Sequence, residues 1–222
     1  MLKLKKHIKT YGLPRSGTNF LEFVLRMNFS INIPMIDKGG WKHTDFPRIN
    51  SIIPSIYILK HPLSWFVSIY KFSLSYPEIF ELENELSFDE FLLSKYTWNE
   101  NVTPIGKENG LFEKKISFSD PIECWNEMNQ KWSKRCSFKI RYESLLGNND
   151  LLLEIEKKFK LKRKTKDFLW PVNELKPGDG FCWDDSGIIT KSVFKYPEKE
   201  YTSYYSRELL KSIESKINYS IY

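Results

Sequence analysis

The chain turns from a candidate strand into a candidate helix at Gly12-Leu13-Pro14-Arg15-Ser16-Gly17-Thr18-Asn19-Phe20. Residues 8–11 predict a short buried strand, and dense apolar positions over 20–27 predict a packed helix. The two glycines allow a tight turn and a close approach of the backbone to an anion. The helix N-terminus adds N–H groups and a positive dipole end, Arg15 adds a charge, and Ser16 and Thr18 add hydroxyls. The loop predicts a cradle for a phosphate-like group; an ordinary helix-capping turn is the alternative.

Length and composition indicate one folded α/β domain over residues 1–222. Hydrophobic residues make up 41% and aromatic residues 16% of the chain, which argues against disorder. The net charge of +6 fits an anionic small ligand or an acidic substrate as well as nucleic acid, and solubility alone would also explain it.

Cysteine usage predicts a reducing, cytoplasmic setting. The three cysteines are widely spaced and form no CxxC pair, so we expect neither a zinc site nor a disulfide framework. The basic N-terminus lacks the apolar region of a signal peptide, and no apolar run reaches 18 residues. We expect no membrane span.

Strand-like and helix-like segments alternate through the N-terminal half, which predicts a central parallel sheet flanked by helices. Residues 55–60 predict a second buried strand, with a helix from Pro62 onward. A third strand is expected over 138–142, before a helix that runs to about Phe159.

Other segments carry weaker signals. Ser87 and Glu90 fit a capping box, and Asp120 fits the start of a helix whose tryptophans belong to the core. Residues 97–119 are expected to be a long loop that acts as a lid or contacts the acceptor, and 171–200 a second loop. The basic run 157–166 is interpreted as a solvated helix end rather than a polyanion contact. A terminal helix is expected over 205–217.

The loop departs from a Walker A motif at two essential positions. Thr18 stands where the phosphate-binding Lys belongs, and Asn19 stands where the magnesium-binding hydroxyl belongs. The strand over 55–60 ends in Lys60 rather than in an Asp. Phosphoryl transfer depends on these three residues, and the motif positions lack them. A kinase-like enzyme is therefore only a secondary hypothesis.

Pro14-Arg15-Ser16-Gly17-Thr18 resembles the 5′-phosphosulfate loop of sulfotransferases that use 3′-phosphoadenosine 5′-phosphosulfate (PAPS). In that family an Arg ends a central strand, and a Ser eight residues later helps it hold the 3′-phosphate. Lys60 and Ser68 have this spacing. Lys60 keeps the charge of the usual Arg without its bidentate geometry.

Two further segments extend the resemblance, which spans residues 12–145. Arg141-Tyr142-Glu143-Ser144-Leu145 is similar to the family's Tyr-Glu-Asp-Leu segment, and the analogy implies that Tyr142 lies near the adenine. Trp41-Lys42-His43-Thr44 looks like the Lys-Thr-His segment of the family's cytosolic members, although no Thr separates Lys42 from His43. Asn19-Phe20 replaces the usual Thr-Trp, so adenine stacking would use Phe20.

The resemblance implies a three-layer, P-loop-NTPase-like fold. It also implies a PAPS-dependent sulfotransferase that needs no metal and releases 3′-phosphoadenosine 5′-phosphate (PAP). Residues 14–20 would bind the donor together with Lys60, Ser68, Tyr142 and, near the C-terminus, Lys191 or Lys195. Arg15 and Lys42 would stabilise the charge that develops during transfer.

His43 is the expected base because its unperturbed pKa of about 6.5 suits proton transfer at neutral pH. Asp45 is the alternative base, and a structural role is the alternative for His43. The acceptor is a small molecule, glycan or peptide, with no nucleic acid expected as a partner. A non-catalytic nucleotide- or nucleic-acid-binding module is the remaining hypothesis.

Overall fold

A three-stranded parallel sheet lies at the centre of the protein, as the sequence predicts. The computed structural model describes residues 6–33, 42–43, 53–82, 84–99, 115–170 and 201–217. The sheet has the order β2-β4-β7 and consists of β2 (Lys9–Tyr11), β4 (Ser55–Leu59) and β7 (Phe138–Arg141). In its register Thr10 pairs with Ile56, and Ile58 pairs with Ile140. The central strand β4 is buried along its whole length, as expected for a parallel sheet covered on both faces.

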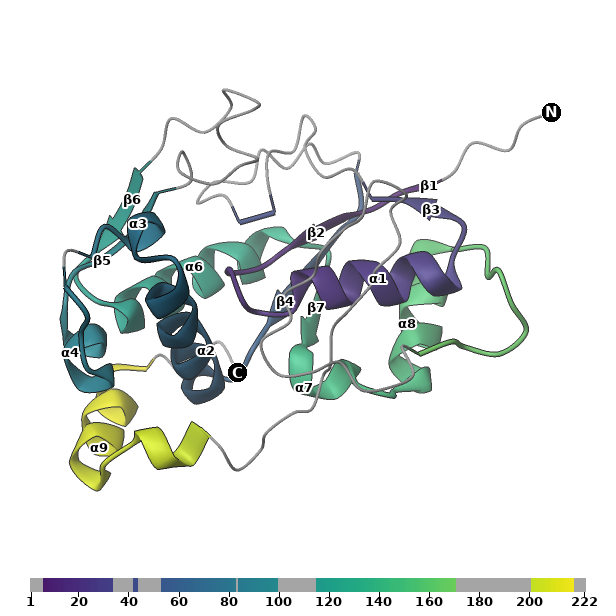
Figure 1. Ribbon diagram of the computed structural model, residues 1–222. Coiled ribbons are helices and arrows are strands. Elements are labelled where there is room, and N and C mark those ends of the chain that lie inside the picture. Colours follow the sequence, from purple (N-terminus) through teal and green to yellow (C-terminus); the bar gives the residue numbers. More distant parts are fainter. Residues whose placement is uncertain are drawn as a thin grey trace.

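Helices cover both faces of this sheet (Figure 1). The side chains of β4 alternate between two hydrophobic clusters, as strand geometry requires. Ile56 and Ile58 join one cluster with residues of α1 (Thr18–Asn28) and α8 (Asn149–Phe159). Tyr57 and Leu59 join the other cluster with residues of α2 (Pro62–Ser75), α6 (Pro121–Arg135) and α9 (Arg207–Lys216). The fold is therefore mixed α/β with a parallel sheet between helices, which is compatible with three layers.

Capping explains where several helices begin. Ser87 and Glu90 form the predicted capping box of α4 (Phe88–Leu93). Asp120 accepts a hydrogen bond from the Glu123 N–H at the start of α6, and Pro62 occupies the first turn of α2. Smaller elements include the strand β1 (Lys6–His7), which pairs in parallel with β3 (Ile31–Asn32), the short helix α3 (Pro77–Phe80) and the 3-10 helix η2 (Tyr201–Tyr204).

The prediction of a long loop over 97–119 is wrong at both ends of the segment, where the structure has strands. Tyr96–Asn99 form β5 and Lys115–Phe118 form β6, and these strands pair antiparallel as a hairpin. Tyr96 and Trp98 place their rings in the core, so the hairpin is held by aromatic packing. The glycines and the proline in the middle of this segment favour a loop, so the sequence did not predict the two short strands beside them. The residues between β5 and β6 lie outside the described ranges.

The third strand and the helix after it also differ from expectation. β7 ends at Arg141, and Tyr142 starts a separate short helix, α7 (Tyr142–Leu145). Gly147 then adopts a φ of 66°, and Asn148 caps α8. A left-handed glycine interrupts a helix because the right-handed helical path cannot pass through it. The predicted loop over 171–200 lies outside the described residues.

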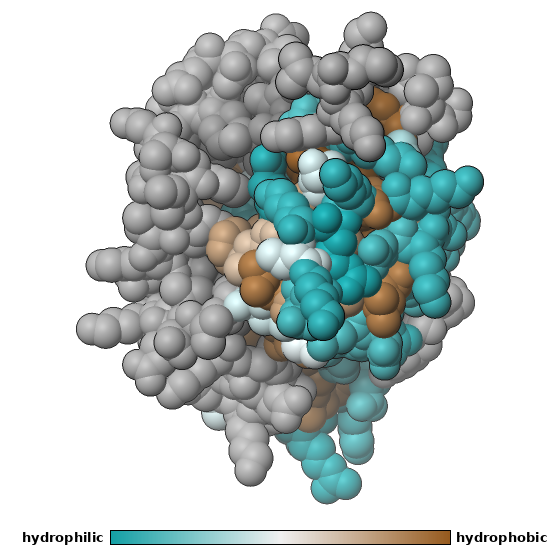
Figure 2. Space-filling view, turned by 90° about the vertical axis from the view of Figure 1, so that its right-hand side faces the viewer, coloured by the Kyte–Doolittle hydropathy of each residue, from teal (hydrophilic) through white to brown (hydrophobic). Residues whose placement is uncertain are grey.

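The basic run 157–166 forms the end of α8 and the turn after it, as interpreted from the sequence. Arg163 pairs with Glu156, and the Lys164 ammonium donates to the Arg26 carbonyl at 2.6 Å. The side of the molecule on which α8 lies is largely hydrophilic where the structure describes it (Figure 2). Among the described helices, none is long and apolar enough to cross a bilayer.

Candidate functional site

The loop between β2 and α1 is built on a tight turn over residues 13–16. The Ser16 N–H donates to the Leu13 carbonyl at 3.1 Å, and the Ser16 hydroxyl donates to the same oxygen at 2.6 Å. Arg15 adopts a left-handed backbone with a φ of 64°. Pro at the second turn position followed by a positive φ at the third is the pattern of a type II turn. Ser16, at 2% exposure, thus shapes the loop with its hydroxyl.

Both glycines of the loop are sterically required. A methyl group on Gly12 would lie 2.7 Å from the Ile58 carbonyl oxygen, in the neighbouring strand β4. A methyl group on Gly17 would lie 2.3 Å from the Tyr142 ring, and Gly17 has a φ of 94°. Gly17 is also the N-cap of α1, so the helix begins directly at the loop with its first N–H groups directed out of the helix end. The buried Thr18 is the first residue of α1.

The predicted pair Lys60 and Ser68 comes together beside this loop. Lys60 follows β4, Ser68 lies in α2, and the ammonium donates to the Ser68 hydroxyl oxygen at 2.6 Å. Since an ammonium group only donates, Ser68 retains its own proton for a further acceptor. The Lys60 ammonium also lies 5.6 Å from the centre of the Tyr142 ring.

Lys60 is partly buried and lies among other charges. Burial and, to a smaller extent, the positive charge of Arg15 lower the pKa of its ammonium to about 8, whereas Glu143 opposes the shift. Glu143 accepts a hydrogen bond from the His61 N–H at 2.8 Å and so fastens α7 to the end of β4. The Arg15 side chain is exposed, and its guanidinium lies 5.2 Å from the centre of the Phe72 ring of α2. Two cations therefore approach each other at the carboxyl end of the sheet.

The segment that carries Lys42 and His43 is fastened to the same loop. The Gly12 N–H donates to the Lys42 carbonyl at 3.1 Å. The Lys42 ammonium donates to Asn19 and forms an ion pair with Glu22 at 3.4 Å, both in α1. The candidate transfer residue Lys42 thus lies next to the start of α1.

His43 lies against the loop in its neutral form. Its Nδ1 is 2.6 Å from the Gly12 carbonyl oxygen, which only accepts hydrogen bonds, so Nδ1 carries the proton and Nε2 the lone pair. Burial, and to a smaller extent the charge of Lys42, lowers the pKa of His43 to about 3. A neutral imidazole can accept a proton, but this low pKa makes it a weak base.

Glu22 belongs to the candidate site, although no motif in the sequence identified it. It is 5% exposed and accepts a hydrogen bond from the Thr10 hydroxyl at 2.6 Å in addition to its ion pair with Lys42. Glu22 shares the helical periodicity of Thr18, Leu21 and Leu25, all of which are buried. Its position on the apolar face of the predicted helix could have identified it, because a buried carboxylate requires a partner.

Two residues expected near the adenine lie in the core. Phe20 is 2% exposed and Tyr142 is 5% exposed, and their rings meet edge-on with centres 6.0 Å apart. The Tyr142 ring also packs against Gly17 of the loop. Adenine contacts by either ring stay predictions.

Three other candidates lie outside the described residues: Asp45, Lys191 and Lys195. Within the described ranges, no three His, Cys, Asp or Glu side chains are grouped as they would be around a metal ion.

Comparison of the chain with protein-family models, curated proteins and solved structures finds no match.

Proposed function

We propose that this protein binds PAPS and transfers its sulfuryl group to a hydroxyl or amine acceptor. The observation that carries the proposal is the hydrogen bond between Lys60 and Ser68 next to the Arg15 loop. The two residues lie in different parts of the fold, and their spacing of eight positions is that of the Arg and Ser that hold the 3′-phosphate in PAPS enzymes. A P-loop-like fold is part of the same proposal, since ligands of open parallel sheets bind at the carboxyl ends of the strands.

In this proposal the two ends of the donor meet different cations. Arg15 and the first N–H groups of α1 hold the 5′-phosphosulfate, since a helix N-terminus and a guanidinium both favour phosphate oxygens. Lys60 and Ser68 hold the 3′-phosphate, with the lysine as a point charge and the hydroxyl as a donor.

Transfer requires an in-line attack of the acceptor oxygen or nitrogen on sulfur. A bond from the acceptor to sulfur forms, the bond from sulfur to the 5′-phosphate oxygen breaks, and PAP leaves with the negative charge. Arg15 and Lys42 stabilise this charge from fixed positions. His43 takes the acceptor proton at Nε2, and Asp45 is the alternative base. Because His43 is a weak base, it receives the proton late, after the bond to sulfur has largely formed.

The first test is calorimetric titration with PAP. We expect binding by the unmodified protein, and a loss of about tenfold or more in affinity for Arg15→Ala and for Ser68→Ala, since each removes a phosphate contact. ATP with Mg²⁺ and a single-stranded oligonucleotide are the competing ligands. If the unmodified protein does not bind PAP, the proposal fails; binding of ATP with Mg²⁺ instead would favour a kinase-like enzyme.

The second test is turnover. Labelled PAPS is offered with phenols, sugars, amines and tyrosine peptides, and transfer of label to one class identifies the acceptor. His43→Ala should lower kcat while leaving PAP affinity unchanged, because His43 acts on the acceptor. Full activity of His43→Ala would remove His43 as the base without affecting the donor site. Binding of PAP without turnover of any class would favour a non-catalytic module.

A further inference from the structure

The turn over residues 13–16 holds Arg15 in a backbone conformation that its residue type disfavours. Its φ of 64° lies in the left-handed region, which Gly or Asn normally occupies at this position of a type II turn. A type I turn would accept Pro14 at the same place and let Arg15 keep a negative φ. Some other contact must select the observed form, since strained residues persist only where their surroundings fix them.

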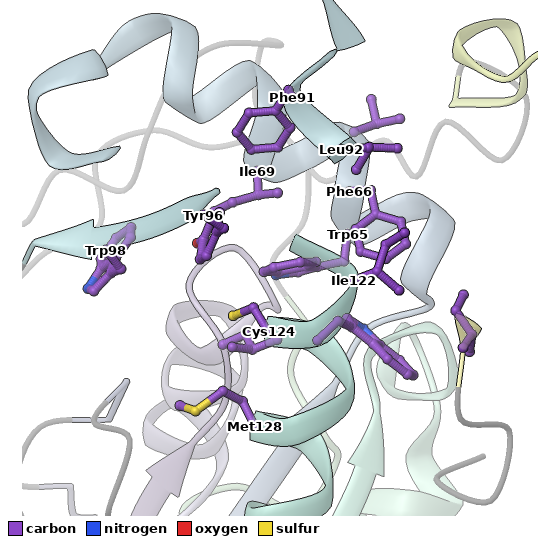
Figure 3. Close-up of a cluster of buried hydrophobic side chains, with 14 of the residues drawn as sticks. Trp65, Phe66, Ile69, Phe91, Leu92, Tyr96, Trp98, Ile122, Cys124 and Met128 are labelled. Atoms are coloured by element: carbon purple, nitrogen blue, oxygen red, sulfur yellow. The ribbon is translucent and has the colours of Figure 1, made fainter. Parts of the chain in front are cut away.

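The indole of Trp65 supplies that contact. Its Nε1 donates to the Pro14 carbonyl oxygen at 2.7 Å. Trp65 is 0% exposed and lies in the cluster beneath the loop, among Tyr96, Phe66 and Ile122 (Figure 3). Types I and II differ chiefly in the orientation of the central peptide, here the one between Pro14 and Arg15. With its carbonyl directed into the core at Trp65, this trans peptide directs the Arg15 N–H away from the core.

The same helix also presents the other half of the anion site. Trp65 and Ser68 are three residues apart in α2, so they lie on neighbouring positions of one face. Trp65 fixes the turn that carries Arg15, and Ser68 accepts the hydrogen bond of Lys60. A rigid helix thus sets the separation between the two cationic parts.

We propose that Trp65 is a positioning residue of the anion site, whose indole N–H holds the Pro14–Arg15 peptide in the orientation that anion binding requires. This inference rests on the proposed function, because PAP is the anion used to test it. Trp65 itself touches no ligand; it acts through the peptide that it holds.

Trp132 offers a matched control for a Trp→Phe substitution. It is also 0% exposed and belongs to the same hydrophobic cluster. Its indole nitrogen is buried, and no described residue forms a hydrogen bond with it. Trp65→Phe and Trp132→Phe therefore remove similar volume from the same core, and only the first removes a hydrogen bond to the loop.

The experiment measures PAP affinity by calorimetry and the turn by NMR in both variants. A type II turn gives a strong nuclear Overhauser effect between the Pro14 Hα and the Arg15 amide proton, and a type I turn gives a weak one. We expect Trp65→Phe to lose this signal and to bind PAP about tenfold more weakly, whereas Trp132→Phe keeps both properties.

The outcomes separate the two proposals. Equal PAP affinity in the two variants, or an unchanged turn signal in Trp65→Phe, overturns the role of Trp65 while leaving the PAP site standing. A failure of the unmodified protein to bind PAP overturns the proposed function. If Trp65→Phe is too unstable to study, Trp65→His is compared with the unmodified protein instead. Retention of PAP affinity and of the turn signal supports a role of the ring N–H, and loss of both in a folded chain contradicts it.

Discussion

Lys60 is the residue at which pH should control the proposed donor site. Burial and the charge of Arg15 lower the pKa of its ammonium to about 8, with Glu143 as the opposing carboxylate. His61, beside it, has a pKa lowered by burial from 6.5, so it is neutral throughout the alkaline range. A bound phosphate favours the protonated ammonium and thus raises this pKa again. Binding should therefore be coupled to uptake of a proton.

We predict that PAP affinity falls as pH rises through 8. If only the charged form of Lys60 binds, the affinity at pH 9 should be about tenfold lower than at pH 7. Lys60→Arg should flatten this dependence because a guanidinium stays charged over the whole range. Lys71→Arg is the matched control, since Lys71 is an exposed lysine of α2, the helix that carries Ser68. Calorimetry across this pH range would contradict the prediction if Lys60→Arg and the unmodified protein had the same slope.

Gly17 and Gly147 form a natural pair for testing the packing under the loop. Both have a positive φ, so an alanine at either position should cost about 1–2 kcal/mol in free energy of unfolding. Only at Gly17 would the new methyl group collide with Tyr142, whereas at Gly147 it meets no described atom within 4 Å. We predict an additional loss of about 1–3 kcal/mol for Gly17→Ala, measured by urea unfolding. An equal loss of unfolding free energy in the two variants would contradict the prediction and show that the Tyr142 ring moves aside at no cost.

At the scale of elements, one ion pair fastens the Lys42–His43 segment to α1. Lys42 and Glu22 are 3.4 Å apart, with side chains 12% and 7% exposed. Loss of one partner leaves a buried charge without compensation, which is strongly destabilising. The ion pair thus holds the proposed transfer residues beside the loop.

We predict a strong thermodynamic coupling between Glu22 and Lys42. In a double-mutant cycle with Glu22→Gln and Lys42→Met, the coupling free energy of unfolding should be about 1–3 kcal/mol. The exposed pair Glu127 and Lys131, 3.0 Å apart in α6, is the control and should give about 0.3–0.5 kcal/mol. A coupling of similar size in the two pairs would mean that the segment is not held by this contact.

The sequence predicts elements well where a single physical signal dominates. The buried strand 55–59 and the cap at Ser87 follow from apolar runs and hydrogen-bonding chemistry that act locally. The hairpin strands β5 and β6 were not predicted, because each is only four residues long and depends on pairing with the other. The break between α7 and α8 depends on the backbone of Gly147, which neighbouring residue types do not reveal.

For the site, the sequence identified partners whose spacing resembles a known motif and missed those that meet only in space. The Lys60–Ser68 spacing was visible, and the contact exists. The contacts of Glu22 with Thr10 and Lys42, and of Trp65 with Pro14, join elements whose approach no local pattern encodes. The burial of Phe20 agrees with the packed helix that its sequence predicts, whereas the contact of Tyr142 with Gly17 depends on the position of α7.

At the scale of the whole molecule, all three strands of the central sheet lead into the proposed site. The Arg15 loop follows β2, Lys60 follows β4, and Tyr142 and Glu143 follow β7. A ligand that bridges these ends binds the folded chain only, so it must raise the free energy of unfolding of the entire sheet.

We predict that PAP at 100 times its dissociation constant stabilises the protein by about 2.7 kcal/mol, seen as a rise of several degrees in Tm. Ser68→Ala and Arg15→Ala should lose most of this rise at the same PAP concentration, because each removes a proposed phosphate contact, one on α2 and the other on the loop after β2. ATP with Mg²⁺ should give a smaller shift, since the loop lacks the lysine and hydroxyl of a triphosphate site. A rise that persists in both variants would place PAP elsewhere on the molecule, and the strand ends would then need a different ligand.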